Sequence, residues 1–312
     1  MAKRTLPRLL QTPAVVLLLI WMLVPLSMTL YFSFIRYVLV NFRRPDWATP
    51  SLSNWRGFGN YKYVLDAKDF WMAIQNSVLI VSSILVLTVI LGLLIAVLIN
   101  RTFPGRGIVR VLLISPFFVM PAVNAVLWIN MILDPVLGLN GLAVSGLNEF
   151  VAGLRDFPVM GGFFAMWPEL HPISFRATQT SAYAVIMMVT WQWTPFAVLI
   201  FMTSLQSEDE SQKEAAMLDG ASAWSQFINL TVPHLARPIA IVVMIQSIFH
   251  LSLYAEIEIV SRGNGNKNLP YLIGEFTSNN IGAASATGIF AVILANIVAI
   301  FLLRMVGKSL MD

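Results

Sequence analysis

The sequence predicts an all-α membrane protein with six transmembrane helices. Hydrophobic residues make up 57% of the chain and charged residues only 12%, whereas soluble globular proteins carry about 25% charged residues. Runs without any charged residue, such as 9–35 and 276–303, exceed the roughly 20 apolar residues that a helix needs to cross a bilayer. Lipid is therefore the solvent that suits this chain.

Each predicted span lies on one of these apolar runs. The first run follows Lys3, Arg4 and Arg8; it is longer than the roughly 7–15 apolar residues of a signal peptide and has no cleavage site, so we expect it to stay as a span. The fifth run is shorter and extends past Glu256 and Glu258. The predicted spans are residues 12–35, 71–100, 109–133, 179–205, 238–260 and 283–305, within a single transmembrane domain, residues 1–312.

Two further apolar runs lie between the third and fourth spans. Residues 135–148 and 157–168 are rich in Gly and Pro and too short to cross a bilayer. We expect them in an external loop, residues 134–176, as short interfacial helices.

Basic residues near the span ends indicate the orientation. With the N-terminus inside, the cytoplasmic segments are 1–8, 101–110, 205–237 and 304–312, and they hold half of the 20 Lys and Arg residues in fewer residues than the external segments do. This density predicts that both termini are cytoplasmic.

Several classes of function are excluded. No cysteine is present, so disulfides, thiolate metal sites and cysteine nucleophiles are ruled out. The three histidines have no ligand spacing and no Ser/His/Asp set stands out, so we expect no metal and no catalytic residue. Gly307-Lys308-Ser309 resembles the end of a phosphate-binding loop, but Leu302 stands where that motif needs glycine. Without a basic patch that interleaves with aromatic residues, nucleic acid is not an expected partner.

The segment after span four, residues 206–237, carries clear local signals. Ser207 and Glu210 have capping-box spacing, which predicts a helix start at Ser207. Gly220 suits the left-handed conformation that ends a helix, and a second short helix, 223–230, is expected to run to Pro233. The adjacent alanines in the first helix have small side chains, so another protein can approach that face of the helix closely.

The spacing in this segment resembles the EAA loop of ABC importer permeases. Its pattern is filled by Glu214, Ala215, Ala216, Gly220, Leu230, Val232 and Pro233, and Asp219, Ala221 and Phe227 match the form common in sugar permeases. The resemblance implies a type I ABC importer permease fold in the bacterial inner membrane, with this segment as the coupling helix. It also implies four partners: an ATP-binding subunit dimer that holds ATP and Mg²⁺, a second homologous permease subunit, a periplasmic solute-binding protein and the lipid membrane. No cofactor is expected on this chain.

Other stretches resemble carbohydrate permeases. Residues 107–121 are similar to the third-span entrance of that group, residues 191–196 to its fourth span, and residues 288–304 to the tail of the sorbitol and mannitol subgroup. The segment 261–268 lacks the Gly-Gly-Pro turn common in sugar permeases, and the external loop is longer than usual. The resemblance therefore implies a polyol or related small carbohydrate as cargo and leaves the exact substrate open.

Polar and aromatic residues within the spans are candidates for the substrate path, because sugars need hydrogen-bonding groups and aromatic walls. Helix-to-helix bonding is the competing explanation for each of them. Gln246, His250 and Tyr254 follow one another at i, i+4, which predicts one helix face. The full candidate set is Asn124, Trp128, Trp191, Gln192, Trp193, Gln246, His250 and Tyr254.

Three prolines and two acidic residues complete the interpretation. Pro116, Pro121 and Pro195 are expected to kink spans three and four. Glu256 and Glu258, near the outer end of span five, are expected to form a gate or a contact with a binding protein. A standalone ion-coupled transporter is the alternative function, but His250 is the only ionisable residue found deep in a span.

Overall fold

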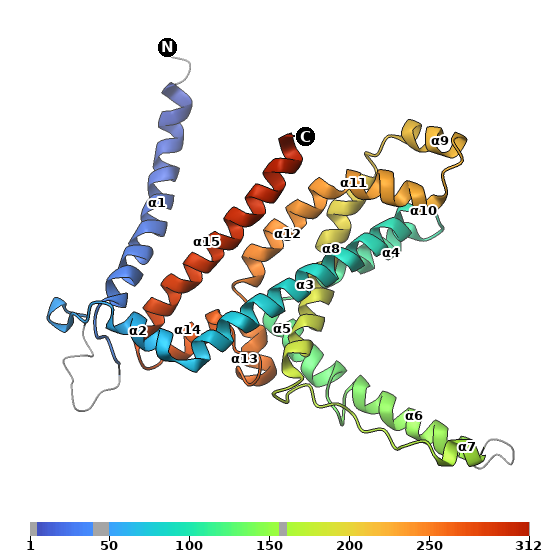
Figure 1. The fold of residues 1–312 in the computed structure, drawn as a ribbon, viewed down its shortest axis with the longest axis horizontal. Coiled ribbons are helices and arrows are strands. Elements are labelled where there is room, and N and C mark those ends of the chain that lie inside the picture. Colours follow the sequence, from blue (N-terminus) through green and yellow to red (C-terminus); the bar gives the residue numbers. More distant parts are fainter. Residues whose placement is uncertain (1–4, 40–49, 156–160, 312) are drawn as a thin grey trace. The chain divides into compact units, whose positions relative to one another are not determined.

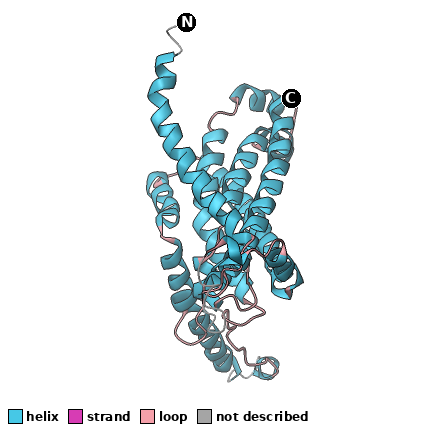
Figure 2. Ribbon diagram, turned by 90° about the vertical axis from the view of Figure 1, so that its left-hand side faces the viewer, coloured by secondary structure: helices cyan, strands magenta, loops and turns pink. Residues whose placement is uncertain are grey.

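The structure is a computed structural model that describes residues 5–39, 50–155 and 161–311. In this part of the chain the regular structure is helical (Figure 2), with no strand and two isolated backbone bridges. Four helices are long and apolar enough to cross a membrane, and two bent helix pairs raise the number to six if each pair is one span. The predicted all-α membrane fold is confirmed, with four to six candidate spans, and the exact count of six stays a prediction.

The first of two compact units comprises Met1–Ile74 and Leu269–Asn296. Buried Asn60 stabilises it by donating from Nδ2 to the carbonyls of Ser33, at 2.9 Å, and Ile35, at 2.7 Å. This unit holds α1 (Thr5–Ser33), η3 (Leu52–Asn54), α2 (Gly59–Asp66), the start of α3 (Lys68–Asn100), α14 (Leu269–Thr277) and most of α15 (Ile281–Met311). Its apolar core consists of Val64, Phe70, Ala73, Leu269, Leu272, Ala283 and Ala286.

The second unit comprises Gln75–Asn268 and Ile297–Asp312. Its central element is α8 (Ser181–Leu205), which packs on several helices of the same unit (Figure 1). The other elements between α3 and α8 are α4 (Arg106–Ile114), η4 (Ser115–Phe118), α5 (Pro121–Leu127), η5 (Trp128–Ile132), α6 (Leu139–Arg155) and α7 (Gly161–Ala165). Those after α8 are α9 (Glu210–Leu218), α10 (Ala223–Gln226), η6 (Phe227–Thr231), α11 (Val232–His234), α12 (Ala236–His250) and α13 (Ala255–Ser261).

α8 is the best buried of the long helices because it packs against η4, α12, α13 and α5, and α3 also approaches it closely. A Cβ atom added to Gly92 of α3 would lie 2.7 Å from the Cβ of Ala197, so the two backbones approach as closely as glycine allows. The share of the apolar window that is buried is 67% in α8 and at most 28% in the other long helices. The helix continues through Pro195 without a break.

The third predicted span, residues 109–133, is sharply bent. The helices on either side of Val119 and Met120 meet at 103°. Met120 is extended, and Pro121 starts the next helix. The expected kink at Pro116 and Pro121 is therefore confirmed, because proline cannot donate the backbone hydrogen bonds that would continue the helix.

The fifth predicted span, residues 238–260, is not one helix. α12 ends at His250 and α13 begins at Ala255. Asn268 donates from Nδ2 to the carbonyl of Leu253 at 2.7 Å, the acceptor that an unbroken helix would offer to the amide four residues later. The predicted single helix is thus wrong, because a turn at residues 251–254 separates α12 from α13, and Asn268 bonds to this turn.

The external loop contains a longer helix than expected. Instead of ending near residue 148, α6 extends over 17 residues, from Leu139 to Arg155. The returning chain is fastened to it at Asn148, which donates to the carbonyl of Leu170 at 2.8 Å and accepts from its amide at 3.0 Å. Residues 157–160 of the second predicted run lie outside the described residues.

Candidate functional site

The segment 206–237 forms two short helices joined at Gly220. Gly220 has φ +78°; its amide donates to the carbonyl of Met217 at 3.1 Å, and the next amide, of Ala221, donates to Ala216 at 2.9 Å. This pair of bonds is the Schellman ending of a helix, which needs a left-handed residue at this position. Ser222 then caps α10 by accepting from the amide of Ser225 at 3.2 Å. The local expectation of a sharp bend at Gly220 is confirmed.

The start of the first helix differs from the prediction. α9 begins at Glu210, and its N-cap is Asp209, whose Oδ1 accepts from the Ser211 amide at 2.9 Å. The hydrogen bonds from the Ser211 hydroxyl and amide lower the pKa of the Asp209 carboxyl, so the cap is charged at neutral pH. The predicted capping box at Ser207 is therefore wrong: the Ser207 hydroxyl donates to the carbonyl of Ser204 at 2.8 Å, and Asp209 forms the cap instead.

The base of this segment is fastened by a side chain that the sequence interpretation did not single out. Glu208 pairs with Lys213 at 2.9 Å through Oε2 and accepts from the Thr231 hydroxyl at 2.9 Å through Oε1. Beside it, Nε2 of His234 lies 2.9 Å from the carbonyl of Ser204. The bond of Thr231 to Glu208 and the contact of His234 with Ser204 join the chain that leaves α8 to the chain that enters α12. No sequence signal marks the partners, because 23 residues separate Glu208 from Thr231.

The tip of the segment is an exposed apolar surface. Leu218 is 89% exposed, Trp224 70% and Met217 62%, and the ring of Phe227 lies 5.7 Å from that of Trp224. Large exposed apolar side chains on a firmly held element are typical of a protein-binding surface. Among the predicted coupling residues, Glu214, Ala215, Asp219, Gly220 and Pro233 are exposed, and Ala216, Ala221 and Phe227 are half-buried.

The predicted path residues on α8 point in three directions. Gln192 is buried against α5: Nδ2 of Asn124 donates to its Oε1 at 3.0 Å and to the carbonyl of Met188 at 3.2 Å. The Gln192 amide donates in turn to the carbonyl of Val119 at the bend of span three. Asn124 and Gln192 thus make the helix-to-helix bonds that the sequence left open as the competing explanation.

Trp128 and Trp191 line an apolar cavity of about 350 Å³. Their ring centroids lie 5.9 Å apart with the edge of one ring on the face of the other. The remaining walls come from α3, α4 and α8 and are almost entirely aliphatic. A cavity with so few polar groups does not suit a sugar.

Trp193, His250 and Tyr254 line a different cavity, of about 310 Å³, together with Phe249 and Glu256. Trp193 lies edge-on to His250 with 5.0 Å between the ring centroids. Tyr254 lines the cavity from the turn that precedes α13. The expected helical stripe of Gln246, His250 and Tyr254 is therefore wrong at its last member, although Tyr254 still lies at the same cavity as His250.

His250 combines burial with unused hydrogen-bonding capacity. The residue is 1% exposed, and neither ring nitrogen has a hydrogen-bond partner among the described residues. Gln246, one turn earlier, is fully buried and its Nε2 lies 3.4 Å from the carbonyl of Trp193. The cavity therefore joins aromatic faces to a polar ring that can bind a hydroxyl group. The described part of the chain contains no cluster of three or more His, Asp or Glu residues able to hold a metal ion.

Comparisons with known proteins show what this chain resembles. Residues 88–312 match the family described as "Binding-protein-dependent transport system inner membrane component". A probable ABC transporter permease protein, y4oQ of Sinorhizobium fredii, is 31% identical over 73% of this chain, and the match covers 65% of that relative. The trehalose transport system permease protein SugA of Mycobacterium tuberculosis is 23% identical, with 99% of this chain and 91% of that protein covered.

A solved structure shares the fold. The crystal structure of a bacterial ABC transporter involved in the import of the acidic polysaccharide alginate contains a chain with a TM-score of 0.74 and 19% sequence identity to this one. The match covers 98% of this chain and 96% of that chain.

Proposed function

Because this chain belongs to the family of binding-protein-dependent transport system inner membrane components, we propose that it is the permease subunit of an ATP-driven ABC importer for a polyol or related small carbohydrate. The family consists of transport components, so the prediction that the chain is not an enzyme is confirmed. The carbohydrate assignment rests on the sequence resemblance of the third, fourth and sixth spans, and the polyol assignment on that of the sixth. A permease for another sugar or sugar derivative is the alternative within the same class.

The segment 206–237 is proposed to couple this subunit to a separate ATP-binding subunit dimer, which binds ATP and Mg²⁺. The two ends of the segment are joined by the bond between Thr231 and Glu208, and His234 contacts the carbonyl of Ser204 in α8. A displacement of the tip would therefore be passed to α8 and α12. The exposed side chains at the tip, above all Leu218 and Trp224, provide the contact surface. Glu214, Ala215, Ala216 and Gly220 set the shape of that surface.

The cavity at His250 is proposed to hold the cargo during translocation. The single observation that carries this proposal is the buried His250 ring, whose nitrogens have no partner among the described residues while Trp193, Phe249 and Tyr254 surround the same cavity. Carbohydrates are bound by hydrogen bonds to their hydroxyl groups and by aromatic faces against their apolar ones. The walls of the cavity at Trp128 and Trp191 are mostly apolar, and this cavity is not assigned to the cargo.

The remaining machinery is proposed to lie in other chains. A second homologous permease subunit completes the pore, and a periplasmic solute-binding protein delivers the cargo to the external segments. In this arrangement the subunit lies in the bacterial inner membrane with both termini cytoplasmic, and the segment 206–237 faces the ATP-binding subunits. Closure of those subunits on ATP would open the cargo cavity alternately to the two sides.

Purification and reconstitution test this proposal. The tagged chain should co-purify with an ATP-binding subunit and a second permease subunit, and vesicles that contain the complex should take up a polyol only with ATP and the solute-binding protein. A panel of alditols, hexoses and disaccharides identifies the cargo. Uptake by the isolated chain without ATP would instead support the standalone transporter.

A further inference from the structure

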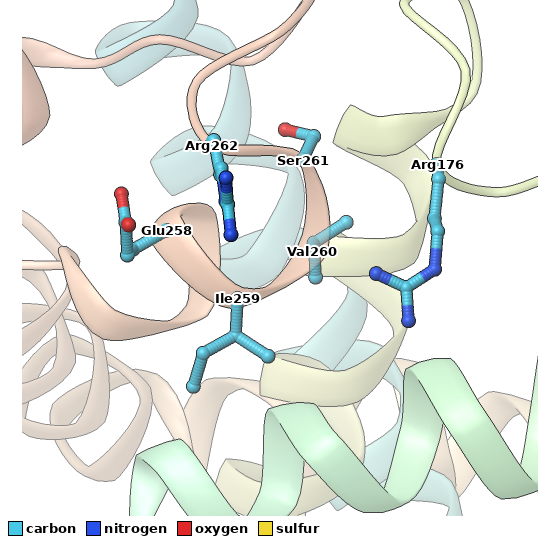
Figure 3. Close-up of a pocket in the computed structure, with 6 residues that line it drawn as sticks. All are labelled: Arg176, Glu258, Ile259, Val260, Ser261 and Arg262. Atoms are coloured by element: carbon cyan, nitrogen blue, oxygen red, sulfur yellow. The ribbon is translucent and has the colours of Figure 1, made fainter.

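A second polar cavity lies at the opposite end of α8 from the segment 206–237. It has a volume of about 500 Å³ and is lined by Arg176 and by residues 258–262 (Figure 3). Arg176 precedes α8 by five residues, and α8 is 25 residues long, which corresponds to roughly 37 Å of helix. In the proposed orientation the cavity, here called the arginine pocket, is on the periplasmic side.

Two hydrogen bonds bring the walls of the arginine pocket together. The Thr178 hydroxyl donates to Oδ1 of Asn264 at 2.8 Å, and the Ser181 hydroxyl donates to the Asn264 carbonyl at 2.8 Å. Gly265, with φ +79°, lies so close that an added Cβ would be 1.9 Å from the Thr178 carbonyl oxygen. The turn that follows Arg262 is thus held tightly against the segment that follows Arg176.

The two arginines of the pocket are held in different ways. Nη2 of Arg176 donates to Oδ1 of Asn130 at 2.7 Å. Arg262 ends α13 with φ +51°, a left-handed conformation that side chains other than glycine seldom adopt. Figure 3 shows the two side chains on either side of Val260, with Glu258 beyond Arg262. Within the described residues neither arginine forms an ion pair. The nearest carboxylates are Glu258, which lines the pocket, and Asp134, whose pKa is lowered by amide hydrogen bonds from Leu137 and Val136 and by the charge of Arg176.

We infer that the arginine pocket binds an acidic side chain of the solute-binding protein and thereby docks that protein on this subunit. A planar guanidinium group binds a carboxylate through two parallel hydrogen bonds, which gives both strength and a defined orientation. Ile259 and Val260 supply an apolar floor beside the charges, a combination with arginine that is common where protein interfaces concentrate their binding energy. The inference rests on the proposed function, because it presupposes a binding protein.

A protein carboxylate fits the arginine pocket better than a cargo carboxylate does. Arg176 and Arg262 are both exposed at the surface, whereas the cargo cavity is lined by the buried His250. A transported molecule must be bound weakly enough to leave, and two fixed guanidinium groups would retain an anion. Glu258 would repel an anionic cargo, but it can pair with a basic residue next to the acidic one on a protein surface.

The test measures docking with the complete transporter in lipid nanodiscs and its own solute-binding protein. The double variant Arg176→Gln, Arg262→Gln should raise the Kd of the binding protein at least tenfold and should reduce the dependence of Kd on salt. Its ATPase rate at saturating binding protein should stay within twofold of the wild type, because the coupling segment is unchanged. Lys62→Gln is the matched control, since it removes an exposed basic side chain of α2 that does not line this cavity.

A reversal of charge sharpens the test. Arg262→Glu should weaken docking further, and one Asp→Lys or Glu→Lys variant of the binding protein should restore it. An unchanged Kd and salt dependence in the double variant would overturn the inference, as would normal docking combined with loss of uptake of an acidic sugar. The proposed function itself fails only if the wild-type complex shows no uptake that depends on the binding protein, so the two failures are distinguishable.

Discussion

Substitution of Gly220 gives the sharpest test of the coupling segment. Its φ of +78° lies in the left-handed region, and an added Cβ would meet no atom within 4 Å. The cost of Gly220→Ala is therefore purely a backbone cost, about 1–2 kcal/mol, which changes an equilibrium roughly 5–30-fold. Gly220→Pro costs more, because proline fixes φ near −65° and removes the amide that donates to Met217.

The consequence can be measured as affinity for the ATP-binding subunit and as amide hydrogen exchange over residues 215–226. We expect Gly220→Asn to stay near the wild type, because asparagine tolerates the left-handed region. Gly220→Ala should weaken binding about 5–30-fold, and Gly220→Pro should abolish uptake while the protein still inserts. Gly146→Ala is the matched control, since Gly146 lies in α6 with open space around it and no positive φ.

Two outcomes would refute this reasoning. Wild-type binding in both Gly220→Ala and Gly220→Pro would show that the bend does not support docking. If Gly220→Asn were as damaging as Gly220→Pro, a steric clash with the partner, rather than the backbone conformation, would explain the effect.

Three other changes test the remaining parts of the structure. Thr231→Val removes the hydroxyl that donates to Glu208. Because the lost bond is to a charged group, the free energy of local opening of the coupling segment should fall by about 1.5–3 kcal/mol. Unchanged amide hydrogen exchange in the segment would contradict this. Asn124→Leu and Gln192→Leu should each lower stability by about 1–3 kcal/mol in thermal unfolding, since each leaves its partner buried and unpaired, and the double variant should lose less than the sum. Strict additivity would show that the two amides do not depend on each other. His250→Phe keeps an aromatic ring but removes both nitrogens. The KM for cargo should rise roughly tenfold, which corresponds to a loss of about 1.4 kcal/mol of binding free energy, and the ATPase response to the binding protein should not change. An unaltered KM would exclude His250 from the cargo site.

Local signals in the sequence predicted the conformation of single residues in the proposed coupling segment and in span three. Gly220 has the conformation that its position after a short helix predicts, and Pro121 starts a helix as its chemistry requires. The prediction was wrong at Ser207, where two neighbouring residues offered the same kind of cap and Asp209 formed it. Competing local choices of similar free energy cannot be ranked from the sequence, because each capping residue contributes only about 1 kcal/mol.

The interior of the spans could be predicted only in part. A periodic pattern identified the polar residues on α8 and α12, but it could not tell which of them face a cavity. Gln192 bonds to Asn124 and Val119, whereas Trp191 and Trp193 on either side of it line two different cavities. The directions of adjacent side chains follow from helix geometry, while the neighbours that they meet follow from packing.

By itself the sequence determined that this chain is a helical membrane protein and that the segment 206–237 bends at Gly220. Both follow from properties of adjacent residues: the length of apolar runs, the need of backbone groups in lipid for internal hydrogen bonds, and the backbone freedom of glycine. Only the tertiary structure decided the contact of Asn268 with the turn after α12, the bond of Glu208 with Thr231 and the cavity that Arg176 and Arg262 both line. Each of these depends on a side chain that bonds to a segment far away in the sequence, as Asn268, Thr231 and Asn264 do, and no local pattern specifies such a partner.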